Sequence, residues 1–489
     1  MMTHTTPLAV TILGLSKSGL AVAEYVIAHG GRCFLSELSP ASPANEDYQR
    51  QLSAFAERTS SPEQLAWELG GHSKSVFTFS DLIVTSPGIP PTSPVMEQLQ
   101  ASGKEVISEV EFAYRQNKMT RQLPMVGITG TNGKTTTTTL ISEILTHANH
   151  IAPSCGNIGT PVISCIDNPD NDYLVVELSS FQLAFSPTLT ADIAVFLNLR
   201  PDHLNWHGSL ASYQRANMRL FTAHPSPKWI VLHAEDPVSQ EIAANTTSQI
   251  LWFSLSQDTV KDRTNRIFME DSGQVVIETT ESPPTTLLDT SRIKLRGRHN
   301  LENILAAAAT AFLLEMPVEK IQAACTAFTG VEHRLELVTT FSKADKIVPI
   351  YNDSKATNTD AAISALNAFE KEPLVLIAGG RDKMEDLTEF SERVKAIACH
   401  VVLLGEAQQR FSEALSAVGY TGISVADSLE VAVQKAMDIA LSSPNGCPIL
   451  FSPACASFDM YPNFEIRGQA FKQYVSAYSN ETTGLKGVL

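Results

Sequence analysis

The chain has 489 residues, enough for about three domains. Hydrophobic residues make up 43% of it, an ordinary share for a protein with buried cores, and no apolar run reaches the ~18 residues that span a bilayer. The formal net charge of -16 argues against nucleic acid or an anionic membrane as the main partner, so we expect neither.

Two further features concern the compartment. Residues 1–7 lack the charged and apolar regions of a signal peptide. The seven cysteines are scattered without Cys-x-x-Cys spacing, which favours a reducing environment over a disulfide framework or a zinc site. We therefore expect a cytoplasmic protein.

The chain opens with a pattern typical of a Rossmann-like βαβ unit. Residues 8–15 are predicted to form a strand, residues 14–19 a turn that opens a helix to about Ala28, and residues 33–37 a second strand that ends at Glu37. Ser16 replaces the second glycine of G-x-G-x-x-G, so a dinucleotide is less favoured than another nucleotide at the strand tips. The alternative is a tight strand–helix turn that binds nothing.

The rest of the first domain is less regular. Residues 38–75 are polar and loosely patterned. A strand over 81–88, a helix near 95–102, a short strand at 106–108 and a helix over 109–117 follow. The polar stretch 118–124 then marks a domain boundary.

The stretch from Met125 to Thr135 predicts a phosphate-binding loop. It consists of a buried apolar strand, the glycine-containing turn T-G-T-N-G-K-T and a helix start. Glycine lets backbone N–H groups face phosphate oxygens, Lys134 can reach the β- and γ-phosphates, and the Thr135 hydroxyl can hold Mg²⁺. The strict P-loop pattern expects glycine at position 128, where Ile128 stands. The alternative is an ordinary turn rich in glycine and threonine.

Polar residues at the ends of later strands suggest how the nucleotide is used. The strand over 173–179 delivers Glu177, and His203 follows the strand over 191–199. An acid and an imidazole near the γ-phosphate could hold Mg²⁺ together with Thr135. Taken singly, Glu177 could instead be a capped strand end and His203 a structural histidine. Strands at 228–232 and 250–254, hairpin or loop residues 256–291 and a helix over 300–314 complete this part.

The last third of the chain repeats the alternation of strands and helices. Strands at 346–351, 373–378, 400–404 and 447–451 are each followed by glycine or polar residues, the positions where ligands bind in open α/β sheets. Lys355 and Lys383 lie in two of these loops and could neutralise phosphate or hold a substrate carboxylate. The alternative is two solvated lysines.

These patterns predict an α/β protein of three domains. We expect a Rossmann-like domain over residues 1–118, a central P-loop ATPase-type mononucleotide-binding domain over 119–330 and a Rossmann-like domain over 331–489. We also expect a monomer.

Nine motifs together resemble the Mur ligases, and among them the members that add D-glutamate. In chain order they are GITGTNGKTTTT (127–138), GNIG (156–159), ELSSFQL (177–183), GRHN…N (297–303), EHRLE (332–336), NDSKATN (352–358), GG(x)₂K (379–383), SPACASFD (452–459) and NFEIRG (463–468). The likeness runs nearly end to end. It implies domains for the UDP-linked substrate, for ATP and for the incoming amino acid.

The resemblance implies a two-step ligation. The γ-phosphate of ATP is transferred to the carboxylate of UDP-N-acetylmuramoyl-L-alanine, and the amine of D-glutamate then displaces phosphate to form an amide for peptidoglycan synthesis. A carboxylate is a poor electrophile, so phosphorylation supplies a leaving group while Mg²⁺ and lysine offset the charge that develops. Because the contacts are divided among three domains, we expect the third domain to close onto the central one during catalysis.

The resemblance also assigns residues. The catalytic set is Lys134, Glu177, His203, Lys355 and Lys383, with Thr135, Glu177 and His203 as the Mg²⁺ ligands. The nucleotide set is Gly130, Thr131, Asn132, Gly133, Lys134, Thr135 and Thr136, together with Asn300, Asn303, His333, Arg334 and Asp353 as the adenosine contacts. For the UDP-linked substrate, Leu15, Ser16, Ser36, Glu37 and Gly88 are implied as contacts to the uridine phosphates and base, and Asn157 and Gln182 as contacts to the muramoyl portion. The D-glutamate pocket comprises Thr357, Ser457, Phe458 and Phe464 together with Lys355 and Lys383.

Two segments depart from the family pattern. Asn217 stands where the family usually has a lysine that is carbamylated and helps to bind a second Mg²⁺. A neutral amide cannot be carbamylated, so the second metal site is weaker, completed by another group, or dispensable. Arg381 and Asp382 occupy the GG(x)₂K loop and alter the charge of the predicted amino-acid pocket.

Two other functions are compatible with parts of the sequence. A sister ligase would add a diamino acid, a dipeptide or a folate glutamate, but the SPACAS and NFEIRG segments favour the D-glutamate adder and no DNPR-like motif is present. A degenerate homologue or regulator would bind ATP without ligating. Asn217 is the only residue that favours this second alternative.

Overall fold

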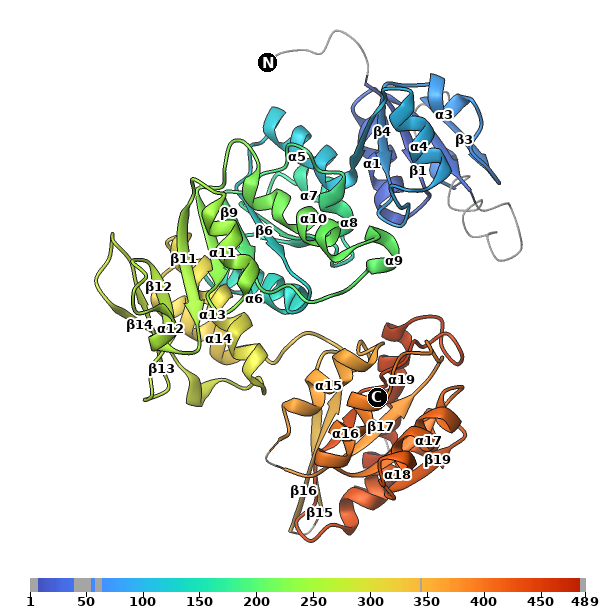
Figure 1. The fold of residues 1–489 in the computed structure, drawn as a ribbon, viewed down its shortest axis with the longest axis vertical. Coiled ribbons are helices and arrows are strands. Elements are labelled where there is room, and N and C mark those ends of the chain that lie inside the picture. Colours follow the sequence, from blue (N-terminus) through green and yellow to red (C-terminus); the bar gives the residue numbers. More distant parts are fainter. Residues whose placement is uncertain (1–7, 39–53, 58–63, 344, 371, 484–489) are drawn as a thin grey trace. The chain divides into compact units, whose positions relative to one another are not determined.

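The computed structural model describes residues 8–38, 54–57, 64–343, 345–370 and 372–483. The chain forms two compact units, one comprising Met1–Ile293 and Glu302–Thr326 and the other Lys294–Leu301 and Ala327–Leu489. Each contains its own sheet or sheets with helices packed on them (Figure 1). Residues 1–7, in which the sequence shows no signal-peptide pattern, lie outside the described residues. The domain boundaries expected at 118 and 330 remain predictions.

The first sheet, blue in Figure 1, has the strand order β3-β2-β1-β4-β5, and all its strands are parallel. This doubly wound order confirms the Rossmann-like opening. The strands are β1 (Ala9–Leu13), β2 (Arg32–Glu37), β3 (Leu65–Leu69), β4 (Leu82–Thr85) and β5 (Glu105–Ser108). The helices are α1 (Lys17–Ala28), α3 (Ser75–Thr78), α4 (Pro94–Ala101) and α5 (Glu109–Met119). The prediction for residues 38–75 missed β3, whose alternating burial is weak.

The second sheet of this unit has the order β14-β13-β12-β11-β10-β9-β6-β8-β7. Its strands are β6 (Met125–Thr129), β7 (Ser154–Gly156), β8 (Leu174–Glu177), β9 (Ile193–Phe196), β10 (Trp229–His233), β11 (Gln249–Ser254), β12 (Arg266–Met269), β13 (Gln274–Glu278) and β14 (Thr285–Asp289). The strands from β7 to β12 are parallel, and β13 and β14 add an antiparallel hairpin, as predicted for residues 256–291.

The helices around this sheet explain the alternation of patterns in the sequence. They are α6 (Lys134–His147), α7 (Ile163–Ile166), α8 (Ser180–Ala184), α9 (Leu204–His207), α10 (Leu210–Thr222), α11 (Pro237–Ala244), α12 (Gln257–Val260), η3 (Thr290–Arg292), α13 (Arg298–Leu313) and α14 (Val318–Ala327). Strand β6 is buried at all five positions and lies between β9 and β8. A strand buried on both faces has no polar alternation, which is why residues 125–129 form a continuous apolar run apart from their last residue.

The sheet of the second unit has the order β15-β16-β20-β17-β18-β19, parallel except for the edge strand β15. Its strands are β15 (Glu336–Lys343), β16 (Lys346–Asn352), β17 (Leu374–Gly379), β18 (Ala398–Leu404), β19 (Ile423–Ala426) and β20 (Ile449–Phe451). Its helices are α15 (Thr359–Asn367), α16 (Thr388–Ile397), α17 (Gln408–Ala417), α18 (Leu429–Ser442) and α19 (Phe464–Thr483). The four predicted strands are confirmed, and β15 and β19 are additional.

The sheets together form the three-domain architecture that the sequence predicted. Among the described residues, no helix has both the length and the apolar character that a membrane crossing requires.

Candidate active site

Residues 130–133, which we call the glycine loop, lie between the buried strand β6 and helix α6, as predicted. Gly130 and Gly133 have φ values of 139° and 87°, a left-handed region that suits glycine. A Cβ atom on Gly133 would lie 2.1 Å from Oδ1 of Asn303, so the side chain of this predicted nucleotide contact rests against the loop. Thr135 and Thr136 follow in the first turn of α6 and are buried. The N–H groups of this helix start favour an anion.

Contacts with the neighbouring strand and helix hold the loop in place. The backbone N–H of Thr131 donates to the Asn198 carbonyl oxygen at 2.9 Å, and that of Asn132 donates to Asn198 Oδ1 at 2.9 Å. The hydroxyls of Thr131 and Tyr213 lie 2.9 Å apart. Lys134 Nζ donates to the carbonyl oxygens of Gly130 and Thr131 at 2.6 and 2.8 Å, which keeps its ammonium group at the loop.

Glu177 ends strand β8 directly beside β6, where it pairs in register with Ile128. Its side chain is 2% exposed, and Oε1 accepts a 2.7 Å hydrogen bond from Asn157 Nδ2. The other carboxylate oxygen, Oε2, is buried without a hydrogen-bond partner. A buried carboxylate oxygen without a hydrogen-bond partner is destabilising unless a cation or a donor binds it. Glu177 is therefore suited to be a Mg²⁺ ligand.

His203 precedes α9 in a left-handed conformation with φ of 53°. Its ring packs on Phe181, with centroids 4.6 Å apart, and Nδ1 lies 3.5 Å from Asp202 Oδ1. Burial lowers the pKa of His203, and the Lys134 ammonium group lowers it further against the opposing effect of Asp202. The imidazole is therefore neutral at pH 7, the form that binds a metal. With Thr135 and Glu177 it provides a donor set that Mg²⁺ could use.

The two residues predicted to contact the muramoyl portion have clear local roles. The Asn157 amide bonds Glu177, as described above. The Gln182 side chain accepts from the Ser179 N–H and hydroxyl at 2.9 Å each, completing a capping box at the start of α8. A capping box satisfies helix N–H groups that would otherwise lack partners, so Gln182 also stabilises the fold.

The predicted uridine-phosphate residues gather at the carboxyl edge of the first sheet. The Leu15 N–H donates to Glu37 Oε2 at 3.0 Å, and the Ser16 and Ser86 hydroxyls lie 3.3 Å apart. Ser36 Oγ donates to Glu68 Oε1 at 2.7 Å and also lies 2.7 Å from His72 Nδ1. Gly88 lies exposed in the turn after β4.

Glu68 and His72 were not predicted as part of this edge. They belong to β3 and the turn after it, within the region that carried no clear pattern. The sequence signal that could have indicated this contact is Glu68 itself, an acidic residue near the end of a strand.

The adenosine residues predicted for the second unit are mostly buried. Asn352 Nδ2 lies 2.9 Å from His333 Nδ1, and the Asn300 amide donates to the Arg296 carbonyl oxygen at 2.7 Å. Asp353 accepts from Ser452 Oγ at 2.8 Å and from the Leu335 N–H at 3.2 Å. Burial raises the pKa of Asp353 to about 7, against these hydrogen bonds and the nearby arginines. Arg334, which directly follows His333 in the sequence, is partly exposed.

The predicted D-glutamate residues differ in exposure. Lys355 Nζ lies 5.4 Å from the centre of the Phe464 ring, a cation–π distance. Ser457 is buried, Thr357 is partly buried, and Lys383 and Phe458 are exposed. Arg467, which sequence reasoning left without a role, is 1% exposed and donates to Ser354 and Cys455, so it fixes the loops that follow β16 and β20.

Asp382, one of the two departures in the GG(x)₂K loop, is paired within its own unit. Arg410 donates to both carboxylate oxygens at 2.6 and 2.7 Å, and these hydrogen bonds lower the pKa of Asp382. The negative charge of Asp382 is thereby balanced.

The predicted catalytic residues fall into two groups, with Lys134, Glu177 and His203 in the first unit and Lys355 and Lys383 in the second.

Comparisons with known proteins agree with this architecture. Residues 8–108 match the MurD-like N-terminal domain of Mur ligases, residues 128–311 the Mur ligase middle domain, and residues 333–455 the Mur ligase glutamate ligase domain. The chain belongs to the Mur ligase family. Within that family it is MurD-like, because the N-terminal match and the full-length relatives agree.

Two such relatives carry the name UDP-N-acetylmuramoylalanine--D-glutamate ligase. The protein of Alkaliphilus metalliredigens is 36% identical over 471 residues, covering 96% of this chain and 98% of that protein. The protein of Acidobacterium capsulatum is 38% identical over 475 residues, covering 96% of each chain. Among solved structures, the UDP-N-acetylmuramate-alanine ligase MurC of Thermotoga maritima has a TM-score of 0.56 at 18% identity, covering 96% of this chain and 99% of its own. That likeness concerns the fold.

Proposed function

We propose that this chain joins D-glutamate to UDP-N-acetylmuramoyl-L-alanine, with cleavage of ATP to ADP and phosphate, in peptidoglycan synthesis. The observation that carries the proposal is the match along 96% of the chain to ligases named for this reaction. The geometry supports it, because the glycine loop, the ammonium of Lys134 and the half-satisfied carboxylate of Glu177 lie on one edge of the central sheet.

In the first step, a carboxylate oxygen of the substrate attacks the γ-phosphorus of ATP, and the bond to the β-phosphate oxygen breaks. The loop N–H groups and Lys134 bind the phosphates and balance the charge that moves onto ADP. Thr135, Glu177 and His203 would hold Mg²⁺, which supplies electrostatic shielding between the phosphates and the incoming carboxylate. Neutral His203 adds no charge to this cation.

In the second step, the amine of D-glutamate attacks the acyl carbon, phosphate leaves with the bonding electron pair, and the amine loses a proton. Two ammonium groups of the second unit, those of Lys355 and Lys383, would bind the carboxylates of D-glutamate. Thr357, Ser457, Phe458 and Phe464 complete this proposed pocket. Asn300, Asn303, His333, Arg334 and Asp353 form the proposed adenosine site. Leu15, Ser16, Ser36, Glu37, Gly88, Asn157 and Gln182 form the proposed site for the UDP-linked substrate.

The test is ADP release by the purified chain with UDP-N-acetylmuramoyl-L-alanine, ATP and Mg²⁺, with and without D-glutamate. We expect release that requires D-glutamate and falls at least about 100-fold in Lys134→Ala, because charge stabilisation of phosphoryl transfer is lost. Release driven instead by a diamino acid or dipeptide would identify a sister ligase. ATP binding without release for any amino acid would identify a degenerate homologue.

The same proposal includes a cytoplasmic monomer, since the substrates are small molecules and one chain carries motifs for all of them. Light scattering of the purified chain during turnover tests this. A catalytically active dimer with an inactive monomer would contradict it.

A further inference from the structure

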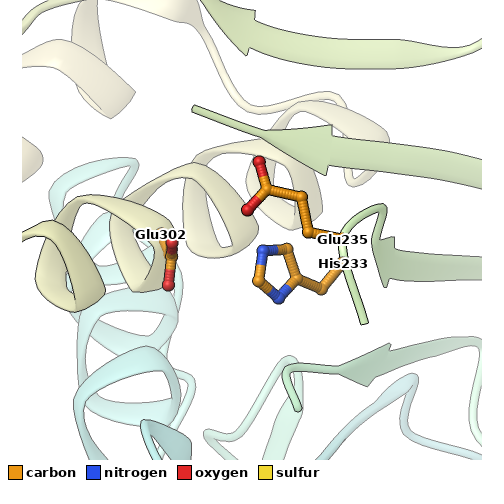
Figure 2. A group of neighbouring side chains, drawn as sticks. All are labelled: His233, Glu235 and Glu302. Carbon is orange, nitrogen blue, oxygen red and sulfur yellow. The ribbon is translucent and has the colours of Figure 1, made fainter. Parts of the chain in front are cut away.

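A second group of potential metal ligands lies away from Glu177 and His203. His233 ends β10, Glu235 follows two residues later, and Glu302 lies in the early part of α13 (Figure 2). One ligand atom from each, an imidazole nitrogen or a carboxylate oxygen, lies within 4.8 Å of the others. All three residues belong to the first unit.

His233 is placed as a ligand would be. Its side chain is 7% exposed, and its Nε2 atom is buried without a hydrogen-bond partner. The ring stacks on Phe253, its register partner on β11, with centroids 4.8 Å apart and planes within 7°. Figure 2 shows the imidazole turned toward the Glu235 carboxylate. The strand pairing therefore fixes the orientation of a buried nitrogen that lacks a partner within the protein.

The two carboxylates come to this nitrogen from different elements. Glu235 is exposed and accepts a 3.1 Å hydrogen bond from Ser254 Oγ, at the end of β11. Glu302 is half-buried on α13. A cation between them would have one enclosed side, formed by His233, and one side open to water.

The donor chemistry selects the kind of cation. One imidazole nitrogen and two carboxylate oxygens are a donor set that Zn²⁺ and Mn²⁺ bind well. Three protein ligands also leave positions for water. We propose that His233, Glu235 and Glu302 bind a divalent transition-metal ion that fastens α13 to the carboxyl end of β10.

The consequence of this site reaches the glycine loop through one neighbouring residue. Asn303 directly follows Glu302, and its Oδ1 occupies the space beside Gly133. A metal ion that fixes Glu302 therefore also fixes the side chain that rests on the loop. β10 is separated from β6 by β9, so the proposed ion is distinct from the Mg²⁺ proposed beside β6.

One native competitor has to be considered. Arg298 precedes Glu302 by four residues in the same helix, and residues at this spacing share one helix face. The experiment must therefore distinguish a metal ion from a guanidinium group as the cation that the carboxylates hold.

The test uses the full chain, stripped with chelator and titrated separately with Zn²⁺ and Mn²⁺ by calorimetry and thermal unfolding, without nucleotide or substrate. We expect one tight equivalent of one of these ions and a higher Tm in its presence. Binding should weaken at least tenfold in His233→Phe, which keeps an aromatic ring on Phe253, and in Glu235→Gln, which is a surface change. The matched control His203→Asn should retain this equivalent.

Co²⁺ substitution should add an absorption band that His233→Phe lacks. Loss of the equivalent in His203→Asn with retention in His233→Phe would place the ion at the glycine loop and overturn the proposal. Binding that appears only in Arg298→Met would show that arginine is the native cation, which also overturns it. Because no ligase substrate is present, failure here leaves the proposed ligation unaffected.

Discussion

The hydroxyl of Thr129 donates to Oδ1 of Asn217 at 2.8 Å, joining the last residue of β6 to the middle of α10. Both side chains are buried. The Asn217 amide nitrogen donates in turn to the Tyr213 carbonyl oxygen at 2.9 Å. Because the same Thr129 hydroxyl also lies 2.9 Å from the Leu178 carbonyl oxygen, its single proton serves one of two acceptors. Asn217 is thus a structural link behind the glycine loop.

Asn217→Ala should lower the free energy of unfolding by about 1 to 3 kcal/mol, because the buried hydrogen-bonded link between β6 and α10 is lost. Urea denaturation measures this. Asn245→Ala is the matched control, since that amide makes a comparable bond to the Glu241 carbonyl oxygen at an exposed helix end. Equal losses in the two variants would contradict a special role for the buried amide.

The ligation rate of the wild-type chain should not depend on bicarbonate, because a carboxamide cannot form a carbamate. The measurement is ADP release in bicarbonate-free buffer and after bicarbonate is added. Asn217→Lys should acquire the dependence, since the lysine ammonium would be buried where Asn217 is 1% exposed and carbamylation changes its charge. A wild-type rate that rises with bicarbonate would mean that a lysine elsewhere takes the modification.

Gly468→Ala should raise the KM for ATP at least about tenfold, if His333 contacts adenosine as proposed. A Cβ at this position would lie 2.2 Å from His333 Nδ1, so the ring has to move. Glycine-to-alanine changes inside helices usually stabilise by about 1 kcal/mol, so a fall in Tm would identify the clash. Ser476→Ala, an exposed change in the same helix, should leave both quantities unchanged. A stabilised Gly468→Ala with normal KM would refute the prediction.

Glu109 should make stability decrease with rising pH. Burial raises its pKa from 4.5 to about 7 in the folded chain, although Oε1 accepts from the Ile163 N–H at 2.8 Å. Below about pH 4.5 both states hold the proton, and the contribution is fully present. As pH rises from there to about 7 the unfolded chain releases its proton first, so the contribution is lost progressively.

The free energy of unfolding of Glu109→Gln, taken relative to that of wild type, should therefore be higher at pH 8 than at pH 5. We expect this relative value to rise by on the order of 3 kcal/mol between the two pH values. Urea denaturation at the two pH values measures it. Glu24→Gln, an exposed change, is the control and should follow the wild-type profile. Parallel profiles for wild type and Glu109→Gln would show that the carboxyl is ionised in the fold.

Local patterns carried most of the architecture. The apolar run before Gly130 and the placement of Glu177 at a strand end were readable because parallel buried strands and their polar ends have short-range signatures. Strand β3 was missed because its five residues pair with β2 across a long connection and alternate weakly in burial. The Ser179–Gln182 capping box was readable from its spacing, yet Gln182 was assigned only to substrate.

The contacts that complete the candidate sites could not be predicted in this way. Thr129 and Asn217 are 88 residues apart in the sequence, and His233 comes close to Glu302 only in the folded chain. Arg467 illustrates the same limit. A charged residue within an exposed-looking helix start gave no sign that it would be buried against two loops from distant strands. Long-range pairing of this kind follows from tertiary packing and leaves no local period.

The left-handed backbone at His203 sets protein stability against the chemistry proposed for that residue. A residue other than glycine or asparagine destabilises the fold by about 1 kcal/mol in this region of backbone conformation. Histidine at position 203 is therefore less favourable for stability than glycine or asparagine would be. Laboratory evolution for heat resistance alone should therefore replace His203 by glycine or asparagine early. A selection that also demands ligation should retain it, and sequencing the two surviving populations would separate the demands of durability from those of turnover.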